Sequence, residues 1–401
     1  MKIRFVILFI AALTLNLYAD AVTSGGTISV NSDSSLNALR NPAIMARQQT
    51  ENTAFAYRYS YMMDSEGDIN VSLAGVKAES DFAMSEDYNG ALLFSNVFHS
   101  GRSSYGIGIS NASDGQVVFS SIETSLKAGT YDVKTTDEKK YAGATLMLSY
   151  SYRLYNGRSF GLQIETAGSS ESVEKHKEGT DESTLNSDVN KITSGCTFGY
   201  YLYQYNYEAG VMLKSGRYGI ENQNYELETS SDESIKKISN YYMNDEGPGV
   251  LLGFGIKPFR KLKVFFEAGY SIPYSYEEKS CDDDTLEKST DDVDLVYTYG
   301  GRWGITYAYS RFLNFGMGGS YIRFKTESSS NVESKTATEK FSVSQINAGI
   351  DIKPSKEYTL LFGAGYKRVL ADLFEEKATS DFGINVTEDY LELMAGVSCN
   401  Y

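Results

Sequence analysis

Hydrophobic and polar side chains alternate along much of this 401-residue chain. In residues 390–401 every second position is apolar or aromatic, and a similar alternation recurs in 142–154, 262–272 and 358–367. Successive side chains of a β-strand point to opposite faces, so each segment has one apolar and one mostly polar face. An edge strand of a soluble β-sandwich would alternate in the same way. The pattern therefore predicts an all-β fold and leaves the class of sheet open.

Short and long connections alternate between the predicted strands, and the long ones are polar and acidic. Tight turns at one end and long loops at the other are typical of a membrane-spanning antiparallel β-barrel. A soluble sandwich does not usually alternate its loop lengths so strictly. The short connections lie near residues 100–102, 155–157, 203–204, 258–261, 310–311 and 354–356, and the long ones include 169–190, 221–246, 277–292, 327–340 and 371–387.

This arrangement predicts an all-β transmembrane antiparallel β-barrel over residues 52–401, with about fourteen strands of ~10 residues each. With an even number of strands, the start of the first strand and the end of the last strand both lie on the side of the tight turns. Closure of the barrel removes the exposed strand edges. The strands are expected to begin near residues 52, 87, 103, 139, 158, 188, 205, 247, 262, 292, 312, 338, 357 and 386.

The first residues have the pattern of an export signal. Lys2 and Arg4 precede an apolar run, residues 5–15, that is too short to span a bilayer. The Ala-Asp-Ala sequence at residues 19–21 supplies a cleavage site of the small-residue type. We therefore predict a signal peptide over residues 1–21, which takes no part in the fold.

The chain ends on an aromatic residue, Tyr401, at the end of an amphipathic strand. This ending resembles the closing strand of bacterial outer-membrane β-barrels. The resemblance implies that the barrel-assembly machinery binds the C-terminal strand. With the export signal, it predicts a protein of the outer membrane, surrounded by membrane lipid.

Composition excludes some classes of function. The net charge of −15 and the pI of about 4.8 argue against nucleic-acid binding, which needs a basic surface. The 32 Tyr and 36 Gly suit many strands with aromatic side chains at the membrane interface. The three cysteines, Cys196, Cys281 and Cys399, match no disulfide framework. Strand phase places Cys196 and Cys399 on the outer face, and Cys281 in a loop.

Residues 22–51 are polar and rich in serine and do not alternate. They contain Asn41, Pro42 and Ala43, preceded by the small polar stretch 32–35. This segment resembles the N-terminal signature of the FadL/TodX family of long-chain fatty acid and hydrocarbon transporters. Ile44 stands where the family often has Gly. An Asn-Pro pair is also an ordinary turn initiator, because proline restricts the residue before it.

The resemblance implies a specific architecture and activity. Residues 22–51 would form a short N-terminal plug, or hatch, inside the barrel. The protein would be a monomeric outer-membrane channel for passive uptake of long-chain fatty acids or similar hydrophobic molecules. The alternatives are a barrel whose long surface loops bind a host or partner, and a general diffusion porin.

In that family a kink in the third strand opens the barrel wall. The third predicted strand here contains a turn-rich patch, and it predicts either such a break or an ordinary loop. The candidate kink residues are Asn111, Ser113, Asp114 and Gly115.

The inward face of the predicted strands mixes charged and apolar residues. Apolar side chains that face a water-filled pore lose solvation, whereas an apolar ligand or a packed plug would cover them. Ligand contact and plug packing remain alternatives for these positions. The candidate ligand-contacting residues are Met147, Met212, Leu251, Phe265, Leu361 and Met394.

No pattern of catalytic or metal-binding residues emerges, and we expect neither enzymatic activity nor a cofactor or metal. The acidic stretch 282–294 lacks the ordered spacing of a calcium loop and is expected to be solvated. His99, near a tight turn, and His176, in an expected long loop, have no surrounding constellation.

Overall fold

We analysed a computed structural model of the chain. The structure describes the backbone of residues 36–47, 51–73, 76–82, 85–120, 123–124, 131–132, 134–178, 183–229, 234–281, 288–330, 335–377 and 380–401. The predicted signal peptide lies outside these residues, as does most of the segment 22–51.

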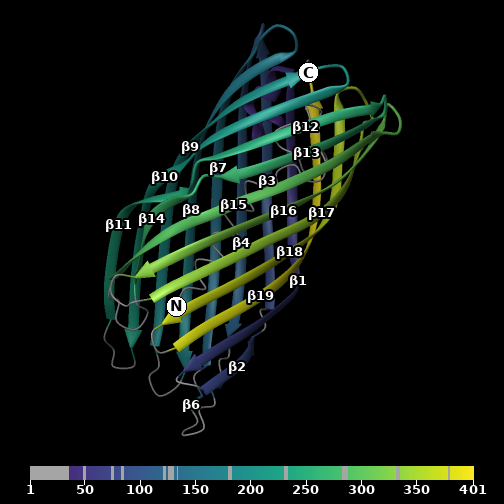
Figure 1. The fold of residues 1–401 in the computed structure, drawn as a ribbon. Helices are drawn as coiled ribbons and strands as arrows, with labels where there is room; N and C mark the ends of the chain where they lie inside the picture. The colour runs from purple at the N-terminus through teal and green to yellow at the C-terminus, as the bar shows by residue number, and fades with distance from the viewer. Residues whose placement is uncertain are drawn as a thin grey trace.

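The described residues form a closed antiparallel β-barrel with fourteen strand positions in its wall (Figure 1). The first strand, β1 (Asn52–Leu73), pairs along its whole length with the last, β19 (Ser380–Asn400), which closes the barrel. Three wall positions are each shared by two consecutive strands: β2 (Val76–Phe82) with β3 (Ser85–Ser100), β11 (Ser234–Glu246) with β12 (Gly249–Phe259), and β13 (Leu262–Ser271) with β14 (Tyr274–Cys281).

The remaining wall strands follow one another in chain order. They are β4 (Ser103–Ser120), β7 (Lys134–Arg153), β8 (Arg158–Glu178), β9 (Ser183–Tyr203), β10 (Tyr207–Thr229), β15 (Lys288–Ala308), β16 (Leu313–Ser330), β17 (Lys335–Ile352) and β18 (Tyr358–Lys377). A separate small ladder joins β5 (Glu123–Thr124) to β6 (Tyr131–Asp132) in the connection between β4 and β7.

All six predicted tight turns lie at one end of the barrel, which we call the turn end. The start of β1 and the end of β19 lie there too, since Tyr401 N donates to Glu51 O at 2.9 Å and Asn400 N donates to Glu357 O at 2.7 Å. In the turn between β7 and β8, Asn156 and Gly157 both have positive φ. Such a backbone suits a tight hairpin, because its twist matches that of the strands. The opposite end is the loop end.

The predicted alternation of faces is confirmed by burial. On β19, Leu391 and Leu393 are exposed on the outside, whereas Glu392 and Met394 are buried on the inside. Most exposed tyrosines of the strands fall into two belts on the outer face, with Tyr57 and Tyr59 of β1 between them. Near the turn end are Tyr105, Tyr150, Tyr207, Tyr307 and Tyr358, and farther up, in what we call the upper belt, are Tyr61, Tyr218, Tyr270, Tyr299, Tyr321 and Tyr366.

The distance between the belts fits a membrane. Tyr358 and Tyr366 are separated by eight residues of β18. At ~3.4 Å per residue this is about 27 Å along the strand. A strand tilt of ~40° shortens it to about 20 Å, of the same order as the ~25 Å apolar band of outer-membrane barrels.

The strands are much longer than predicted, and most of the expected long loops are largely strand. β8 runs to Glu178 and β9 begins at Ser183, so most of segment 169–190 is paired. His176 and Cys281 accordingly lie in strands, not in loops. Beyond the apolar band both faces of a strand can be polar. The hydrophobic alternation therefore stops there while the backbone ladder continues.

The predicted break in the third wall strand is wrong. Residues 111–115 of β4 pair without interruption with β3 on one side and with β7 on the other. Asn111, for example, lies opposite Leu92 and Ala144. The residues of this patch have low intrinsic preference for strands, but pairing on both sides outweighs that preference. Neither a kink nor a loop is present.

Among the residues that the structure describes, no helix is long and apolar enough to cross a membrane. The described helices are the short 3₁₀ segments η1 (Asn37–Leu39) and η2 (Pro42–Arg47).

Candidate functional site

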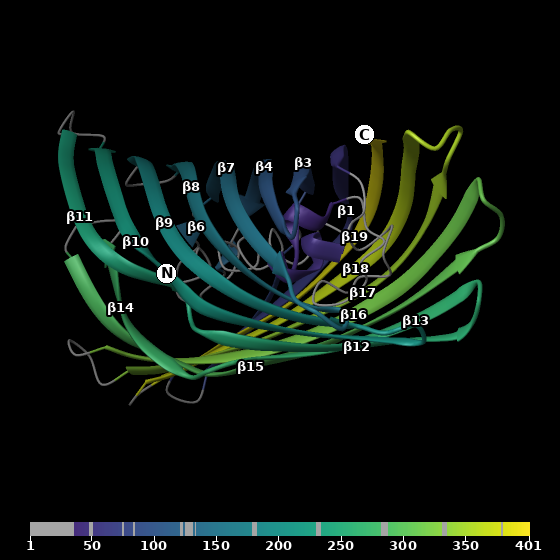
Figure 2. The same cartoon turned by 90° about the horizontal axis from the view of Figure 1, so that it is seen from above.

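Residues 36–47, which we call the plug, lie inside the ring of strands (Figure 2). Leu36, Ala38, Ala43 and Ile44 have no exposed surface. The plug contacts the inner face of β3, β4, β7, β8 and β9, and occupies the part of the lumen closer to the turn end. The predicted signature residues Asn41, Pro42 and Ala43 are all at its centre.

The Asn41 side chain makes hydrogen bonds both to the barrel wall and within the plug. Its Nδ2 atom donates to Tyr200 O and to Val211 O, both at 3.4 Å, on the neighbouring strands β9 and β10. Its Oδ1 atom accepts from Ala43 N at 3.0 Å. This last bond satisfies a backbone donor at the start of η2, as a helix-capping residue does. Pro42 follows as the first residue of η2, where the missing N–H of proline costs nothing.

Glycines on the inner face of the wall make room for the plug. A Cβ atom on Gly161 would stand 2.5 Å from the Pro42 carbonyl carbon, and one on Gly108 would stand 2.6 Å from Leu39 Cδ2. Gly106 and Gly199 leave space in the same way for Met45 and Asn41. Glycine allows a second backbone to approach closely. The sequence contains a signal for this contact, namely glycine repeated at inward positions of three strands.

Polar wall residues bind the plug backbone. Ser95 Oγ accepts from Ala38 N at 3.1 Å, Gln163 Nε2 donates to Ala38 O at 3.0 Å, and Ser159 Oγ donates to Ala43 O at 2.7 Å. All three wall side chains are buried. Removing any one of these side chains would leave a backbone group of the plug without its hydrogen-bond partner, which costs about 1–3 kcal/mol of stability. The plug is therefore bound to the wall by specific polar contacts as well as by packing.

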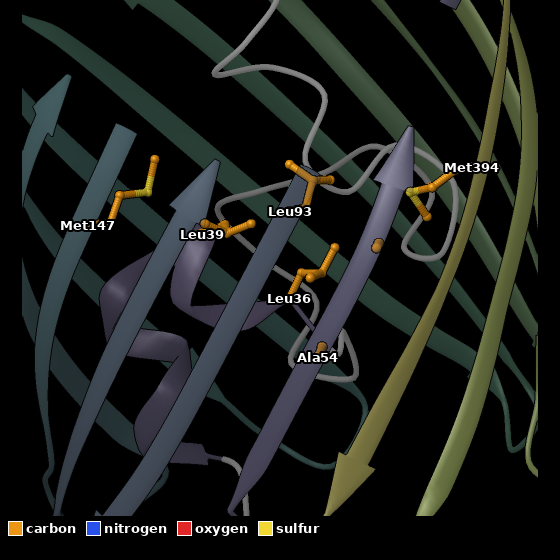
Figure 3. Packing of buried hydrophobic residues seen from close by; sticks show 7 residues of the cluster. Leu36, Leu39, Ala54, Leu93, Met147 and Met394 are labelled. Atoms are coloured by element: carbon orange, nitrogen blue, oxygen red, sulfur yellow. The ribbon is translucent and has the colours of Figure 1, made fainter. Parts of the chain in front are cut away.

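Apolar packing completes this contact. Leu36 and Leu39 of the plug pack with Leu93, Met147 and Met394 of the wall (Figure 3). Met147 and Met394 were candidate ligand contacts from the sequence. Their position supports the alternative interpretation, in which they pack against the plug.

The other four candidates also face inward. Met212, Phe265 and Leu361 are buried, and Leu251 is half-buried. Phe265 lies under Gly255, where an added Cβ would stand 2.8 Å from the ring. All four line the interior of the barrel, and their contact with a ligand stays a prediction.

Arg40 of the plug belongs to a cluster of charged side chains inside the barrel. Arg40 is 1% exposed and lies in the field of Glu208 and Glu267. Burial lowers the pKa of the Arg40 guanidinium to about 9, and these two carboxylates oppose that shift. Arg40 therefore remains charged at neutral pH. The two carboxylates have further partners, since Tyr201 donates to Glu208 and Arg302 pairs with Glu267. Buried charges need such compensation.

A second inner surface lies nearer the loop end, and the sequence analysis missed it. We call it the upper apolar patch. Its rings Phe324 and Phe341 stack at 4.5 Å between centroids, and Val343 lies opposite Val369 on the next strand. Its residues face the lumen from β1 and β16 to β19, and the apolar cluster they form contains no residue of the plug. They are Met62, Phe324, Phe341, Val343, Val369, Ala371 and Tyr390.

The signal for this patch was present in the sequence. Phe324 and Phe341 fall on the inward phase of their strands, directly opposite each other. They flank a segment, 327–340, that was interpreted as a long loop. The inward phase of both strands in fact continues beyond the predicted strand ends.

These features define a class of protein. The structure is a membrane-type β-barrel with two outer aromatic belts, whose lumen contains an N-terminal plug. The search of solved structures finds the same fold in several hydrophobic-compound channels, so the resemblance to the FadL/TodX barrels is confirmed at the level of the fold.

Three of the similar structures illustrate the match. The toluene transporter TodX of Pseudomonas putida is 13% identical, covers 96% of this chain and 98% of its own, and gives a TM-score of 0.62. The toluene transporter TbuX of Ralstonia pickettii is 11% identical with coverages of 97% and 100% and a TM-score of 0.61. A FadL homologue of Pseudomonas aeruginosa is 10% identical with coverages of 94% and 96% and a TM-score of 0.61. No family model and no curated protein matches the chain.

Proposed function

We propose that this protein is an outer-membrane channel for the passive uptake of long-chain fatty acids or similar hydrophobic molecules. The observation that carries the proposal is the upper apolar patch, because seven apolar and aromatic side chains, each at most 7% exposed, pack together inside the barrel above the plug and make this part of the interior apolar. Burying apolar surface stabilises a bound hydrophobic solute by about 25 cal/mol per Å². A lumen of this kind favours apolar solutes over hydrated ions.

A general porin accounts less well for the same lumen. Porins line a water-filled channel with polar and charged groups. Here the plug fills part of the lumen, and two buried carboxylates of the inner wall have basic partners. Glu165 pairs with Arg217 and Glu221 pairs with Lys191, each at 2.8 Å. These paired charges of the inner wall neutralise each other and therefore attract a passing ion only weakly.

The remaining parts of the proposal concern targeting and assembly. Residues 1–21 direct export, and the barrel inserts into the outer membrane with its turn end facing the periplasm, as short turns do in this class. The assembly machinery binds the C-terminal strand, and the barrel acts as a monomer. Support comes from the sequence pattern at both ends of the chain and from the outer-facing apolar band.

The test is uptake by intact bacteria that lack their own channels for hydrophobic compounds. Cells that produce the protein would be compared with cells that carry an empty vector, using a radiolabelled long-chain fatty acid, labelled toluene and a hydrophilic sugar. We expect faster uptake of at least one apolar solute and no change for the sugar. Equal uptake of the apolar solutes in both strains, with folded barrel present in the outer membrane, would refute the proposal.

The same assay separates the alternatives. Faster entry of the sugar would indicate a general porin. A barrel that folds, admits neither class of solute and binds a host protein through its loops would indicate a surface-binding role. A variant that lacks residues 22–51 tests the plug, because its removal is expected to let the sugar enter.

A further inference from the structure

The two ends of the barrel differ in the sign of their charge, although the chain as a whole carries −15. Acidic residues outnumber basic ones in each of the five long segments toward the loop end, 169–190, 221–246, 277–292, 327–340 and 371–387. No acidic residue occurs in five stretches at the turn end, 97–105, 150–162, 200–207, 255–266 and 306–316. Basic charge is therefore concentrated at the turn end, where C is marked in Figure 1.

We call the six tight turns and their flanking residues the rim. Its exposed acidic groups are Glu51, Glu357 and the terminal carboxylate of Tyr401, and all three lie where β1 and β19 close the barrel. Around the rest of the rim, the exposed charged groups of the described residues are basic. The exposed basic residues of the whole rim are Arg102, Arg153, Arg158, Arg260, Lys261, Arg311 and Lys356.

Three arginines surround the turn that joins β7 to β8. The Arg102 guanidinium carbon lies 4.3 Å from the centroid of the Tyr155 ring. Arg153 N donates to Arg102 O at 2.9 Å, and Arg158 N donates to Tyr155 O at 3.4 Å, so the three backbones adjoin. Within the part of the chain that the structure describes, no carboxylate forms a salt bridge with any of the three. Like charges repel at such positions, and an anion between them would relieve that repulsion.

A second basic cluster joins two neighbouring turns. Lys261 Nζ donates to Tyr309 O at 2.9 Å, which holds the turn between β12 and β13 against the turn between β15 and β16. Arg260 precedes Lys261 in the first turn and is exposed. In the second turn the Arg311 guanidinium carbon lies 4.5 Å from the centroid of the Phe312 ring. Three basic side chains and two aromatic residues are thus gathered on this part of the rim.

Exposed aromatic rings accompany the basic groups around the rim. Tyr155 is 71% exposed, Phe259 is 70% exposed and Tyr205 is 78% exposed. Contact with apolar material would stabilise a phenyl ring such as that of Phe259, because water solvates it poorly. Surfaces that bind a membrane interface combine Lys or Arg with aromatic and apolar side chains. The rim has this composition.

The depth of the rim matches the lipid headgroups. Tyr307, in the belt nearer the turn end, is four residues from Arg311, and Tyr358 of the same belt is two residues from Lys356. At ~3.4 Å per residue and a strand tilt of ~40°, two to four residues reach about 5–10 Å beyond the belt. The headgroup layer on one side of a bilayer is about 5–8 Å thick. The basic groups therefore lie level with the phosphates of the leaflet that the turn end faces.

We propose that the rim is a binding surface for anionic phospholipids, with its two basic clusters holding the headgroup phosphates and its exposed rings lying at the headgroup boundary. The proposal goes beyond transport and rests only on the membrane placement proposed above. A lipid fits better than an acidic protein, because the basic groups are spread around a ring at headgroup depth and the turns are too short to protrude. An anionic lipid fits better than a zwitterionic one, because the clusters offer no carboxylate to the ammonium group of a zwitterionic head.

The first experiment measures which lipid stays bound to the folded barrel. Purified protein is mixed with equal amounts of phosphatidylglycerol, phosphatidylethanolamine and phosphatidylcholine with the same acyl chains, and the bound lipids are counted by native mass spectrometry. Heat-modifiable gel mobility verifies the fold of each variant. Three double variants, each lowering the charge by two, are compared: Arg102→Gln with Arg158→Gln and Arg260→Gln with Arg311→Gln on the rim, and Arg323→Gln with Arg368→Gln beside the upper belt as the matched control.

We expect the wild-type protein to retain phosphatidylglycerol in excess over both zwitterionic lipids. Each rim variant should lower that excess by about five-fold per arginine, the usual contribution of one basic residue at an anionic membrane, and the control should not. Added salt should lower it too, because the basic groups are exposed. Equal retention of the three lipids by the wild-type protein, or equal losses in rim and control variants, would overturn the proposal. Displacement of the lipid by inorganic phosphate would do so as well, since the rim would then be a site for the free anion.

The second experiment places a fluorescent probe on the rim. Trp303→Phe removes the single tryptophan of the chain, and Phe259→Trp introduces one beside the second basic cluster. Glu228→Trp, at an exposed position near the loop end of β10, is the control. The proteins are placed in bilayers in which either phosphatidylglycerol or phosphatidylcholine carries bromine on its acyl chains.

Brominated phosphatidylglycerol should quench the probe at residue 259 more strongly than brominated phosphatidylcholine, and neither should quench the probe at residue 228. Absence of quenching at residue 259 would place the rim in water, where an acidic protein could reach it, and would overturn the proposal. Equal quenching by the two lipids would show contact without selection for charge and would overturn it too. Neither experiment measures transport, so a failure of the uptake assay and a failure of lipid binding are distinguished.

Discussion

The Asn41 side chain occupies the space in which a Cβ atom of Gly199 would stand. This relationship joins the centre of the plug to the inner face of β9. Asn41 can donate to Tyr200 O and Val211 O only because residue 199 has no side chain. The match between a signature residue and a wall glycine makes the plug position specific to this sequence.

Gly199→Ala is therefore expected to displace the plug. The added methyl would overlap Asn41 Oδ1, and the wall cannot move without breaking its ladders. Released plug residues would expose Arg40 and Arg47 to trypsin, and single-channel conductance would rise. Gly168→Ala on β8 is the control, since its nearest atom would be 3.9 Å away. The prediction fails if both variants resist trypsin equally.

Asn41→Ala is expected to loosen the plug without altering the wall. The substitution removes the bond to Ala43 N and both bonds to wall carbonyls. Loss of such buried partners costs about 1–3 kcal/mol. The measurement is hydrogen exchange of the Ala43 and Ile44 amides, which should become faster. Asn96→Ala, which removes a bond to Thr53 on the outer face, should leave these amides unchanged.

The upper apolar patch is expected to govern uptake of apolar solutes. Phe324→Ala and Phe341→Ala each remove one ring of a stacked pair on the inner wall. Because the outer face and the ladder are untouched, the barrel should still fold and shift its mobility on heating. Initial uptake of labelled solute should fall in both variants. Phe315→Ala on the outer face of β16 is the control, and equal uptake in all three would contradict the proposal.

Tyr401 is expected to act in assembly more than in stability. In the folded barrel its N–H bonds to Glu51 O, and its side chain is 73% exposed. Removing the residue therefore takes little from the folded state. We expect less folded barrel in the membrane, while the protein that does fold has a nearly unchanged melting point. A large fall in melting point with normal yield would show the opposite.

Much of the fold could be predicted because the apolar band imposes a strict period of two. Inward Met394 and outward Leu393 follow directly from that period. Outside the band the same strands are polar on both faces, so the period carries no information there. Hydropathy therefore predicts a loop over residues 169–178 of β8, although they pair with β9. Strand length beyond the membrane depends on backbone pairing, which hydropathy does not report.

The candidate site was harder to predict for a related reason. The local preference of Asn111 and Gly115 for turns predicts a break or a loop, yet two neighbouring strands hold them extended. The wall is interrupted instead at Pro248, between β11 and β12, and at Pro273, between β13 and β14. Each proline alone resembles a turn residue, and their alignment becomes visible only when the register of four strands is known.

The buried pair Glu165–Arg217 provides a test of how the lumen charges are held. Arg217 Nε donates to Glu165 Oε1 at 2.8 Å, and both side chains are less than 10% exposed. Arg217 also directly follows a bulge in β10. Removing one partner leaves an uncompensated charge, whereas removing both leaves none.

Arg217→Met is therefore expected to lower the free energy of unfolding by about 3–5 kcal/mol, because Glu165 stays buried without its partner. The double variant Glu165→Leu with Arg217→Met should recover most of that loss, since apolar replacements of a buried pair are often neutral. Both values come from urea unfolding followed by gel mobility. Equal losses in the single and double variants would show that the pair is held by packing and not by charge.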